Sequence, residues 1–554
     1  ETCATITPKI SHLGPPHRSG LPGDTRQHEQ SLLDEEDGGE RMSSNHRGRS
    51  YQKSESLEAL LDDDSTRHNH QIIIEGKPGH LWLHRSSRPS DDDSLTSRSY
   101  HTGIHTLESV TSLLTETAHK IVDGSFRFGG RVSSVRDFGG TASIPSEIFN
   151  LIKNLVGAGA LGLPSGVAAF ANGPSALIPA SFALVVMGVV FAYFFLLMGR
   201  LCSLTRAASY REVWEITMGD QWAAIVPLAI VLMASLGNLA YSMILADTTK
   251  SLLLAVGFTV TRTQSLIGVT ICLLLPLCMI KHLSVLAPFS FLGLSGLLFT
   301  IGVMALRYFD GSYDPDRGGE FLKDLPDNLQ PSFGPVGASG VWSSKFLILL
   351  CMTFQAYFAH YNAPRFYVEL KSNTIGRFTT VVASSFGFSA MIFILFTTFG
   401  FLTFGANADG NILNNYSNHD GLASCCRLAI AVALAFTYPL PFIGVRDGII
   451  DLLMVQESKQ TSQNLNALSV ILLTIFTCLA MYFTDLGLLN AVGGGALGTA
   501  VVFILPALMF RGAIRQLGRI ATRDQRREVS FTIGLMWIGT AVGLIGTVVG
   551  LTTT

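Results

Sequence analysis

Long uncharged apolar runs alternate with short polar segments over most of the chain. The first of them contains Asn172-Gly173-Pro174, a turn signal that divides it into two helices. Because a bilayer core about 30 Å thick needs roughly 20 apolar residues of helix, and short alternating strand-like segments are absent, each run predicts a transmembrane helix. We expect eleven, at residues 146–170, 175–199, 222–246, 263–280, 283–306, 346–366, 378–404, 426–448, 463–484, 486–510 and 529–551.

Composition agrees with this pattern. Only 14% of the 554 residues are charged, and the mean hydropathy is +0.37, which excludes a single soluble globule and predicts contact with a lipid bilayer. The net charge of −2 argues against a nucleic-acid partner. We find no Cys/His spacing typical of a metal site, and we expect no cofactor.

Charge divides the chain into two regions. Residues 1–142 are rich in Ser, Asp, Arg and His and poor in bulky apolar residues, so we predict a disordered cytosolic tail that offers sites for trafficking or signalling proteins. Residues 143–554 form the predicted transmembrane domain. A chain that begins with Glu1 is expected to lack its first residues.

Lys and Arg in the connecting loops set the expected orientation. They are more numerous on the side of the tail, which predicts a cytosolic N-terminus and, with eleven helices, a lumenal or extracellular C-terminus. Asn415-Tyr416-Ser417 is an N-glycosylation sequon in the loop after the seventh helix. Since that loop falls on the outer side, we expect Asn415 to be glycosylated.

The first helix contains the clearest departure from regular helix. In the segment 150–164, three glycines and Pro164 fall within eight residues, so we predict a break near Gly157–Gly159. A break exposes N–H groups on one half-helix and carbonyls on the other, which suits a carboxylate and a cation. The alternative is an unbroken, glycine-rich helix that packs closely on its neighbours.

The sixth helix is the expected counterpart of the first. Gln355, Tyr357, His360 and Asn362 precede Pro364, which again predicts an interruption. An imidazole at this place could titrate near neutral pH and carry a proton, or it could be a hydrogen-bonded structural group; both readings stay open. Glu369, shortly after the helix, is a further candidate for proton coupling.

Other polar residues fall inside predicted spans. Asn238 and Tyr241 share one face of the third helix, and Thr437 precedes a proline in the eighth, where a Thr bonded to its own helix is equally expected. Intramembrane polar groups are candidates for a binding site. The Gly493–Gly495 run in the tenth helix is better explained by close packing.

These motifs together resemble the amino acid/auxin permease family, within the APC superfamily. The likeness rests on 154–164, on 358–370, on the Thr437-Tyr438-Pro439 segment and on the glycine-rich tenth helix, and is nearest to the vacuolar and lysosomal amino acid transporter branch. It implies an all-α polytopic protein with a five-plus-five inverted repeat like that of the leucine transporter, plus one extra helix.

The resemblance also implies a function. Family members move neutral amino acids coupled to protons or sodium. Carried over, the substrate site maps to Gly157, Ala158 and Gly159, with Ala160 beside them, and the sodium position of some members maps to Asn154 and Thr437. The loop 308–345 contains no Cys for the disulfide that some sodium-coupled members have, which favours proton coupling.

We therefore expect a secondary active transporter for neutral amino acids, working by alternating access around broken helices 1 and 6. We place it in a vacuolar or lysosomal membrane, with the plasma membrane open. The alternatives are a sodium-coupled symporter and an amino-acid-sensing transceptor that signals through the tail. An enzyme is not expected, because HExxH and GxSxG motifs and paired intramembrane carboxylates are absent from the sequence. The expected substrate-binding residues are Gly157, Ala158, Gly159, Ala160, Asn238, Tyr241, Gln355 and Tyr357, and the coupling residues Asn154, His360, Thr437 and Glu369.

Overall fold

The computed structural model describes residues 127–128, 131–132, 138–279 and 287–553. Most of these residues are helical, as the sequence predicts, and long loops cover residues 311–345 and 405–420. The described strands form a two-stranded hairpin of β1 (Arg127–Phe128) and β2 (Arg131–Val132). Most of the predicted tail, 1–126, lies outside the described residues. The predicted boundary of the membrane domain falls at Ser143, whose hydroxyl accepts a hydrogen bond from the Ser146 N–H and caps the first long helix.

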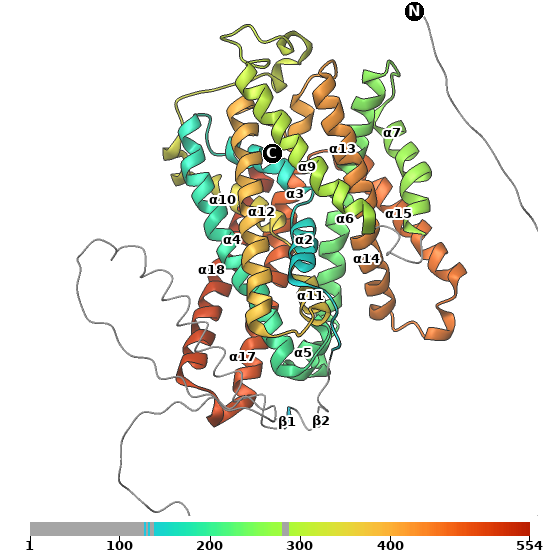
Figure 1. Cartoon of the computed structure of the whole chain (residues 1–554), viewed down its shortest axis with the longest axis vertical. Helices are drawn as coiled ribbons and strands as arrows, with labels where there is room; N and C mark the ends of the chain where they lie inside the picture. Colours follow the sequence, from blue (N-terminus) through green and yellow to red (C-terminus); the bar gives the residue numbers. More distant parts are fainter. Residues whose placement is uncertain (1–126, 129–130, 133–137, 280–286, 554) are drawn as a thin grey trace, which may run out of the picture. The chain divides into compact units, whose positions relative to one another are not determined.

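Seventeen α-helices follow one another along the described chain, and most of them are labelled in Figure 1. They are α2 (Ile144–Leu155), α3 (Gly159–Ala168), α4 (Leu177–Thr205), α5 (Tyr210–Met218), α6 (Ile225–Ala255), α7 (Arg262–Val269), α8 (Leu275–Cys278), α9 (Ala287–Asp310), α10 (Phe346–Ala356), α11 (Ala363–Glu369), α12 (Ile375–Phe404), α13 (Gly421–Thr437), α14 (Pro439–Leu452), α15 (Ser462–Tyr482), α16 (Leu486–Val492), α17 (Leu505–Leu517) and α18 (Arg523–Thr553). Short π-helical segments join α7 to α8 and α16 to α17.

Seven helical segments of the described chain are long and apolar enough to cross a membrane, and the bent pair of α2 and α3 makes an eighth. The remaining predicted spans correspond to the shorter apolar helix Arg262–Cys278, to α9, which follows residues outside the description, and to the interrupted pair of α10 and α11. The protein is therefore an all-helical, multi-pass membrane protein. The count of eleven and the inverted repeat stay predictions.

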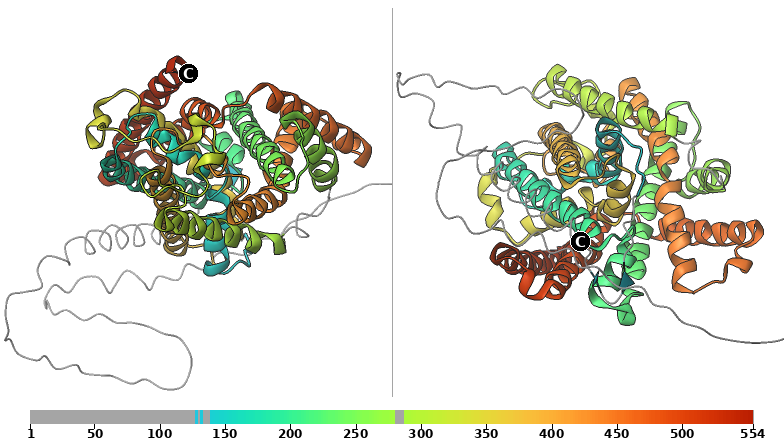
Figure 2. Two further views of the ribbon diagram at one scale, coloured as in Figure 1. Left: turned by 90° about the horizontal axis from the view of Figure 1, so that it is seen from above. Right: turned by 60° about the horizontal axis from the view of Figure 1, so that its bottom comes forward.

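The interrupted helices lie at the centre of the packing. α3 packs against α10, and both contact neighbouring long helices: α12 packs on α2, α3 and α4, while α18 packs on α10. The end-on views show α6, α7, α14 and α15 grouped to one side of these helices (Figure 2). The interrupted pairs are thus surrounded by continuous helices.

The glycine-rich tenth span is a close-packing element, as the sequence predicts. It runs through π-helical turns at Gly493–Gly498. A Cβ on Gly494 would collide with the Cys351 carbonyl oxygen of α10, and one on Gly495 would lie 2.6 Å from the Gly543 carbonyl oxygen of α18. The absence of side chains therefore lets three helices approach one another.

Candidate functional site: two opposed helix breaks over a cavity

The first helix is broken where the sequence predicts. α2 ends at Leu155, α3 begins at Gly159, and the two half-helices are bent by 50°. The N–H groups of Gly157 and Ala158 have no hydrogen-bond partner among the described residues, while the Ala160 N–H donates to the Gly157 carbonyl oxygen over 3.2 Å. The break therefore leaves free main-chain donors beside the free carbonyls at the end of α2.

Glycine is required at the break because of its neighbours. A Cβ on Gly157 would lie 2.9 Å from the Tyr241 hydroxyl oxygen, and a Cβ on Gly159 would lie 2.8 Å from the Ala356 Cα atom. The second contact is with backbone, which cannot swing away. The start of α3 and the end of α10 thus meet directly, main chain against main chain.

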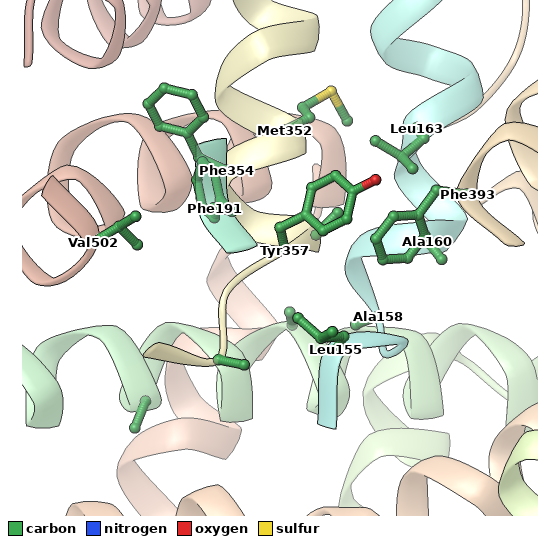
Figure 3. Close-up of a cluster of buried hydrophobic side chains, with 14 of the residues drawn as sticks. Leu155, Ala158, Ala160, Leu163, Phe191, Met352, Phe354, Tyr357, Phe393 and Val502 are labelled. Atoms are coloured by element: carbon green, nitrogen blue, oxygen red, sulfur yellow. The ribbon is translucent and has the colours of Figure 1, made fainter. Parts of the chain in front are cut away.

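The second interruption lies opposite the first. α10 ends at Ala356, a single 3₁₀ turn covers His360–Asn362, and α11 begins at Ala363. Residue 359 has an extended φ of −146°, which takes the chain out of helical geometry. Figure 3 shows the two interrupted helices facing each other, with Ala158 at one break and Tyr357 at the end of α10.

A cavity of about 640 Å³ opens beside the two breaks. This volume is within the range of small-molecule sites. Its wall combines main chain of the first break, polar side chains and a large apolar surface. The lining residues are Asn150, Lys153, Asn154, Leu155, Gly157, Ala158, Gly159, Met233, Ala234, Gly237, Ala240, Tyr241, Gln355, Phe358, Tyr361, Asn362, Arg365, Phe366, Glu369, Thr437, Leu440, Pro441, Ile443, Gly444 and Asp447.

Charged residues mark the mouth of this cavity. Arg365 donates to Glu369 over 2.7 Å, and their side chains are 62% and 46% exposed. Asp447 also lines the cavity, is 60% exposed and pairs with Arg446. The cavity therefore reaches the protein surface at the end where α11 and α14 carry these groups.

The opposite end is closed. Asn490 on α16 is 1% exposed. A Cβ on Gly400 would lie 2.6 Å from the Pro164 ring, and one on Gly410 would lie 2.5 Å from the Gly487 amide nitrogen. Tight contacts between α3, α12 and the 405–420 loop thus seal the second face.

A second, smaller cavity of about 30 Å³ adjoins the first break. Its volume is enough for a water molecule or a small ion. The polar residues in its wall are Lys153, Tyr241 and Thr437, and the rest of the wall is apolar or glycine. Lys153, Gly157, Tyr241 and Thr437 line both cavities.

Comparison with known proteins decides the family. Residues 140–552 match the family described as "Transmembrane amino acid transporter protein". The chain belongs to this family. The match covers the predicted membrane domain and leaves out most of the tail, which agrees with the resemblance read from the sequence motifs.

Two curated relatives illustrate the similarity of this transporter-family chain. A provisionally named sodium-coupled neutral amino acid transporter 11 of Danio rerio is 24% identical over 381 residues, which cover 67% of this chain and 79% of the relative. Amino acid transporter AVT6E of Arabidopsis thaliana is 23% identical over 438 residues, which cover 74% of this chain and 83% of the relative.

Solved structures show a weaker likeness. The crystal structure of MhsT in complex with L-phenylalanine matches with a TM-score of 0.48 and 13% identity, over 72% of this chain and 98% of that one. A Na⁺-coupled sialic acid symporter matches with a TM-score of 0.43 and 13% identity, over 80% and 97%.

The transporter brings most of the predicted substrate residues to the large cavity. Gly157, Ala158, Gly159, Tyr241 and Gln355 all line it. Three predicted residues do not line it: Ala160, Asn238 and Tyr357, which are each almost fully buried behind its wall. The sequence could not make this distinction because spacing shows which residues share a helix face, not which face meets the cavity.

Each of these three residues has a packing role. The Tyr357 hydroxyl donates to the Leu184 carbonyl oxygen over 3.1 Å, and its ring lies against Phe393 (Figure 3). Asn238 donates from Nδ2 to the Ala234 carbonyl oxygen of its own helix over 3.1 Å. Of the two tyrosines expected to contact the substrate side chain, only Tyr241 lines the cavity.

The predicted coupling residues divide in the same way. Asn154, Thr437 and Glu369 line the large cavity. Thr437 also donates to the Ala433 carbonyl oxygen of its own helix over 2.8 Å, which is the second reading of this residue, while its role as a cation ligand stays a prediction. Asn154 accepts a hydrogen bond from Asn362 Nδ2 over 3.4 Å, which links the first break to the second.

His360 lies outside both cavities. Its side chain is fully buried, and its Nε2 atom lies 2.9 Å from the Phe191 carbonyl oxygen. The rings of Phe191 and Phe195 contact it edge to face. These are the surroundings of a structural imidazole, the second of the two readings of the sequence.

Asn415 is placed differently from the expectation. Its side chain is 0% exposed, its Nδ2 atom donates to the Leu329 and Asn407 carbonyl oxygens, and its Oδ1 atom accepts from the Asp409 N–H. The amide nitrogen that would carry a glycan is thus buried and hydrogen-bonded. The loop 308–345 folds over the sequon. A tripeptide motif cannot predict burial by a loop that is distant in the sequence.

Lys153 is a cavity-lining residue that the sequence analysis did not single out. It stands within the conspicuous first-helix motif, and it lines both cavities. The signal was available, since an ionisable residue inside a predicted membrane helix marks a functional position. The glycines and the proline that follow it predict a helix break, and the site was therefore assigned to main-chain groups alone.

Proposed function

We propose that this protein is a secondary active transporter that moves neutral amino acids by alternating access around the breaks between α2 and α3 and between α10 and α11. The observation that supports the proposal is the 640 Å³ cavity, whose wall includes the free N–H groups of the first break. Membership of an amino acid transporter family agrees with it.

The main-chain dipoles at the breaks suit a zwitterion. The N–H groups of Gly157 and Ala158 are free to bind a carboxylate, and the start of α3 adds the positive end of a helix dipole. Asn154 and Gln355 also line the cavity, and their amide groups suit the ammonium group. A substrate bound in this way is recognised by the groups that all amino acids share.

The remaining wall favours uncharged side chains. Met233, Phe358, Leu440 and Ile443 line the cavity, and Phe358 stacks on Tyr361 with ring centroids 5.5 Å apart. Apolar surface of this kind stabilises an apolar side chain and leaves a charged one without a partner. We therefore propose neutral amino acids as the substrate class.

The cavity is open at one end, which is what one of the two access states of such a cycle requires. If the Lys and Arg bias of the loops sets the orientation, the open mouth at Arg365 and Asp447 faces the cytosol. We propose that this is the inward-facing state, in a vacuolar or lysosomal membrane. The transceptor alternative depends on the tail, as do its expected trafficking or signalling partners. Most of the tail lies outside the described residues.

Proton coupling is our proposal for the driving ion, with sodium as the alternative that the name of the Danio rerio relative suggests. The two are distinguished by one uptake experiment. Purified protein in liposomes is supplied with labelled neutral amino acids under a pH gradient, a sodium gradient, both or neither. We expect accumulation of at least one neutral amino acid under the pH gradient. Accumulation of none of them under any gradient would reject the proposed transport.

A further inference from the structure

The turn between α17 and α18 carries a dense cluster of arginines. Both helices belong to segments long and apolar enough to cross a membrane, so the turn that joins them lies near a membrane surface. Between residues 511 and 527 the chain has six arginines, no lysine and a single acidic residue, Asp524. All six arginines are exposed. The arginine cluster consists of Arg511, Arg515, Arg519, Arg523, Arg526 and Arg527.

The packing of α17 explains why these side chains point outward. One face of the helix, which includes Phe510, Ile514 and Leu517, is buried where α17 packs on α4, α5 and α18 (Figure 1). Arg511 and Arg515, four residues apart, share the other face. The buried apolar residues thus fix the orientation in which the helix presents its cations.

The turn itself adds an apolar side chain to the cations. Gly518, with a φ of +57°, ends α17 and reverses the chain. Ile520, which follows it, is 66% exposed and stands between Arg519 and Arg523. An exposed apolar side chain among basic residues is typical of segments that lie in the interface of a bilayer.

Most of the cluster has no partner within the protein. Arg527 lies 3.6 Å from Asp524, and both side chains are more than 70% exposed. Arg526 donates to the Gly518 carbonyl oxygen over 3.0 Å. The arginines that form no ion pair and no side-chain hydrogen bond among the described residues are Arg511, Arg515, Arg519 and Arg523.

The acidic residues nearest to the cluster already have partners. Glu528, in the first turns of α18, accepts from Arg200 Nη2 of α4 over 2.9 Å. Glu215, on the α5 helix that packs against α17, accepts from Arg211 Nε over 2.8 Å. The cluster therefore keeps an excess of positive charge, which an anion from outside the protein can neutralise.

The chemistry of the cluster points to phosphate. A guanidinium group binds two phosphate oxygens at once, and a chain of arginines without lysines favours this planar contact over a simple point charge. Basic clusters beside a transmembrane helix attract anionic lipid headgroups, which present phosphate groups at the same depth. We propose that the arginine cluster binds the phosphate groups of anionic phospholipids in the adjacent leaflet and anchors the α17–α18 turn to the membrane surface. This binding is separate from the proposed transport.

The test compares wild type with Arg515→Gln/Arg519→Gln/Arg523→Gln. The full chain is reconstituted in liposomes of phosphatidylcholine and phosphatidylserine, extracted in mild detergent and washed, and the phosphatidylserine retained per protein is measured. Both leaflets contain both lipids, so the result does not depend on orientation. We expect wild type to retain phosphatidylserine beyond its share of the liposome lipid. The variant should lose roughly tenfold of that excess, and high salt should lower the excess of wild type as well.

A matched control removes the same charge elsewhere. Arg317→Gln/Lys323→Gln/Lys345→Gln replaces three exposed cations in and just after the loop 308–345 and should retain as much phosphatidylserine as wild type. A second measurement follows the thermal unfolding temperature in phosphatidylcholine–detergent micelles. Added phosphatidylserine should raise this temperature for wild type and for the control, and much less for the cluster variant.

Several outcomes would overturn the proposal. They are a wild type without excess phosphatidylserine, an excess that does not respond to salt, and equal losses in the cluster variant and the control. Inorganic phosphate provides the last comparison: a rise in unfolding temperature equal to that with phosphatidylserine would indicate a site for free phosphate and reject the lipid. Amino acid uptake enters none of these measurements, so failure of the transport proposal would leave their result unchanged.

Discussion

At the scale of single residues, Gly159 shows how much the site depends on the absence of a side chain. It faces the backbone of Ala356, and a Cβ would lie 2.8 Å from the Cα atom and 3.1 Å from the amide nitrogen. Because real Cβ contacts are not that short, any side chain here must separate the two interrupted helices. The close approach of the two interrupted helices therefore requires that residue 159 has a hydrogen atom in place of a side chain.

We predict that Gly159→Ala reduces uptake by roughly a hundredfold, because a shift of about 1 Å misplaces the free N–H groups relative to the substrate. The measurement is initial uptake in liposomes, normalised to folded protein. Gly237→Ala is the matched control: Gly237 lines the same cavity from within α6, and a Cβ there meets nothing within 4 Å. Equal uptake by the two variants would show that the contact with Ala356 is not needed for transport.

At the scale of elements, the interrupted helices are tied together where each begins or ends. Ala142, just before α2, pairs with Leu370, just after α11: the Ala142 N–H donates to the Glu369 carbonyl oxygen over 2.9 Å, and the Lys371 N–H donates to the Ala142 carbonyl oxygen over 2.9 Å. Two backbone hydrogen bonds thus join the start of α2 to the end of α11. This link favours a movement of the two half-helices together.

The loop before α13 is held by a buried cation. Arg427, 1% exposed, donates to the carbonyl oxygens of Leu413, Tyr416 and Ser417 over 2.9, 2.5 and 3.2 Å. Arg307 and Tyr313 bond the carboxylate of Asp420, which caps α13. This end of the molecule is therefore a rigid cover over the closed side of the cavity.

We predict that Arg427→Met lowers the free energy of unfolding by about 3 kcal/mol, because three buried carbonyl groups lose their donors while the volume of the side chain is nearly kept. Thermal unfolding of the purified protein in detergent measures the change. Arg317→Met removes an arginine whose side chain is 65% exposed, and this control should change stability by less than about 1 kcal/mol. A loss for Arg427→Met no greater than that of the control would contradict the account.

At the scale of the whole molecule, the large cavity is accessible from one face only. Asn150 lines it and is exposed, whereas Asn490, on the sealed side of α3, is 1% exposed. In an alternating-access cycle this asymmetry belongs to one state and reverses in the other. Solvent access to these two positions therefore reports which state is populated.

We predict that Asn150→Cys reacts with a membrane-impermeant maleimide added on the tail side of sealed vesicles, while Asn490→Cys is protected without substrate. Both are made in a chain in which Cys3 and the exposed cysteines of the described residues, Cys272, Cys425 and Cys478, are replaced by Ser. Labelling of Asn150→Cys only from the opposite side would reverse the proposed orientation. Rapid labelling of Asn490→Cys would show that the closed end is open in the membrane.

Much of the architecture is determined by local sequence. Apolar runs of bilayer length must form helices in lipid, since no water is present there to pair the backbone. Gly157, Gly159 and the segment before Pro364 interrupt two of those helices because local residues disfavour continuous helix, and both interruptions are found where the sequence predicts them. Family membership follows from the same motifs.

The tertiary structure alone decided which polar groups meet. The helical pattern places Asn238, Tyr357 and His360 within spans, yet the packing of α4, α10 and α12 buries Tyr357 and His360 behind the cavity wall, and the packing of α13, α14 and α16 on α6 buries Asn238. It also buries Asn415 under a loop distant in sequence and brings Lys153 beside Thr437 across about 280 residues. Periodicity and turn chemistry are local properties of the chain, whereas burial, cavity access and neighbouring charge arise only when distant helices pack together.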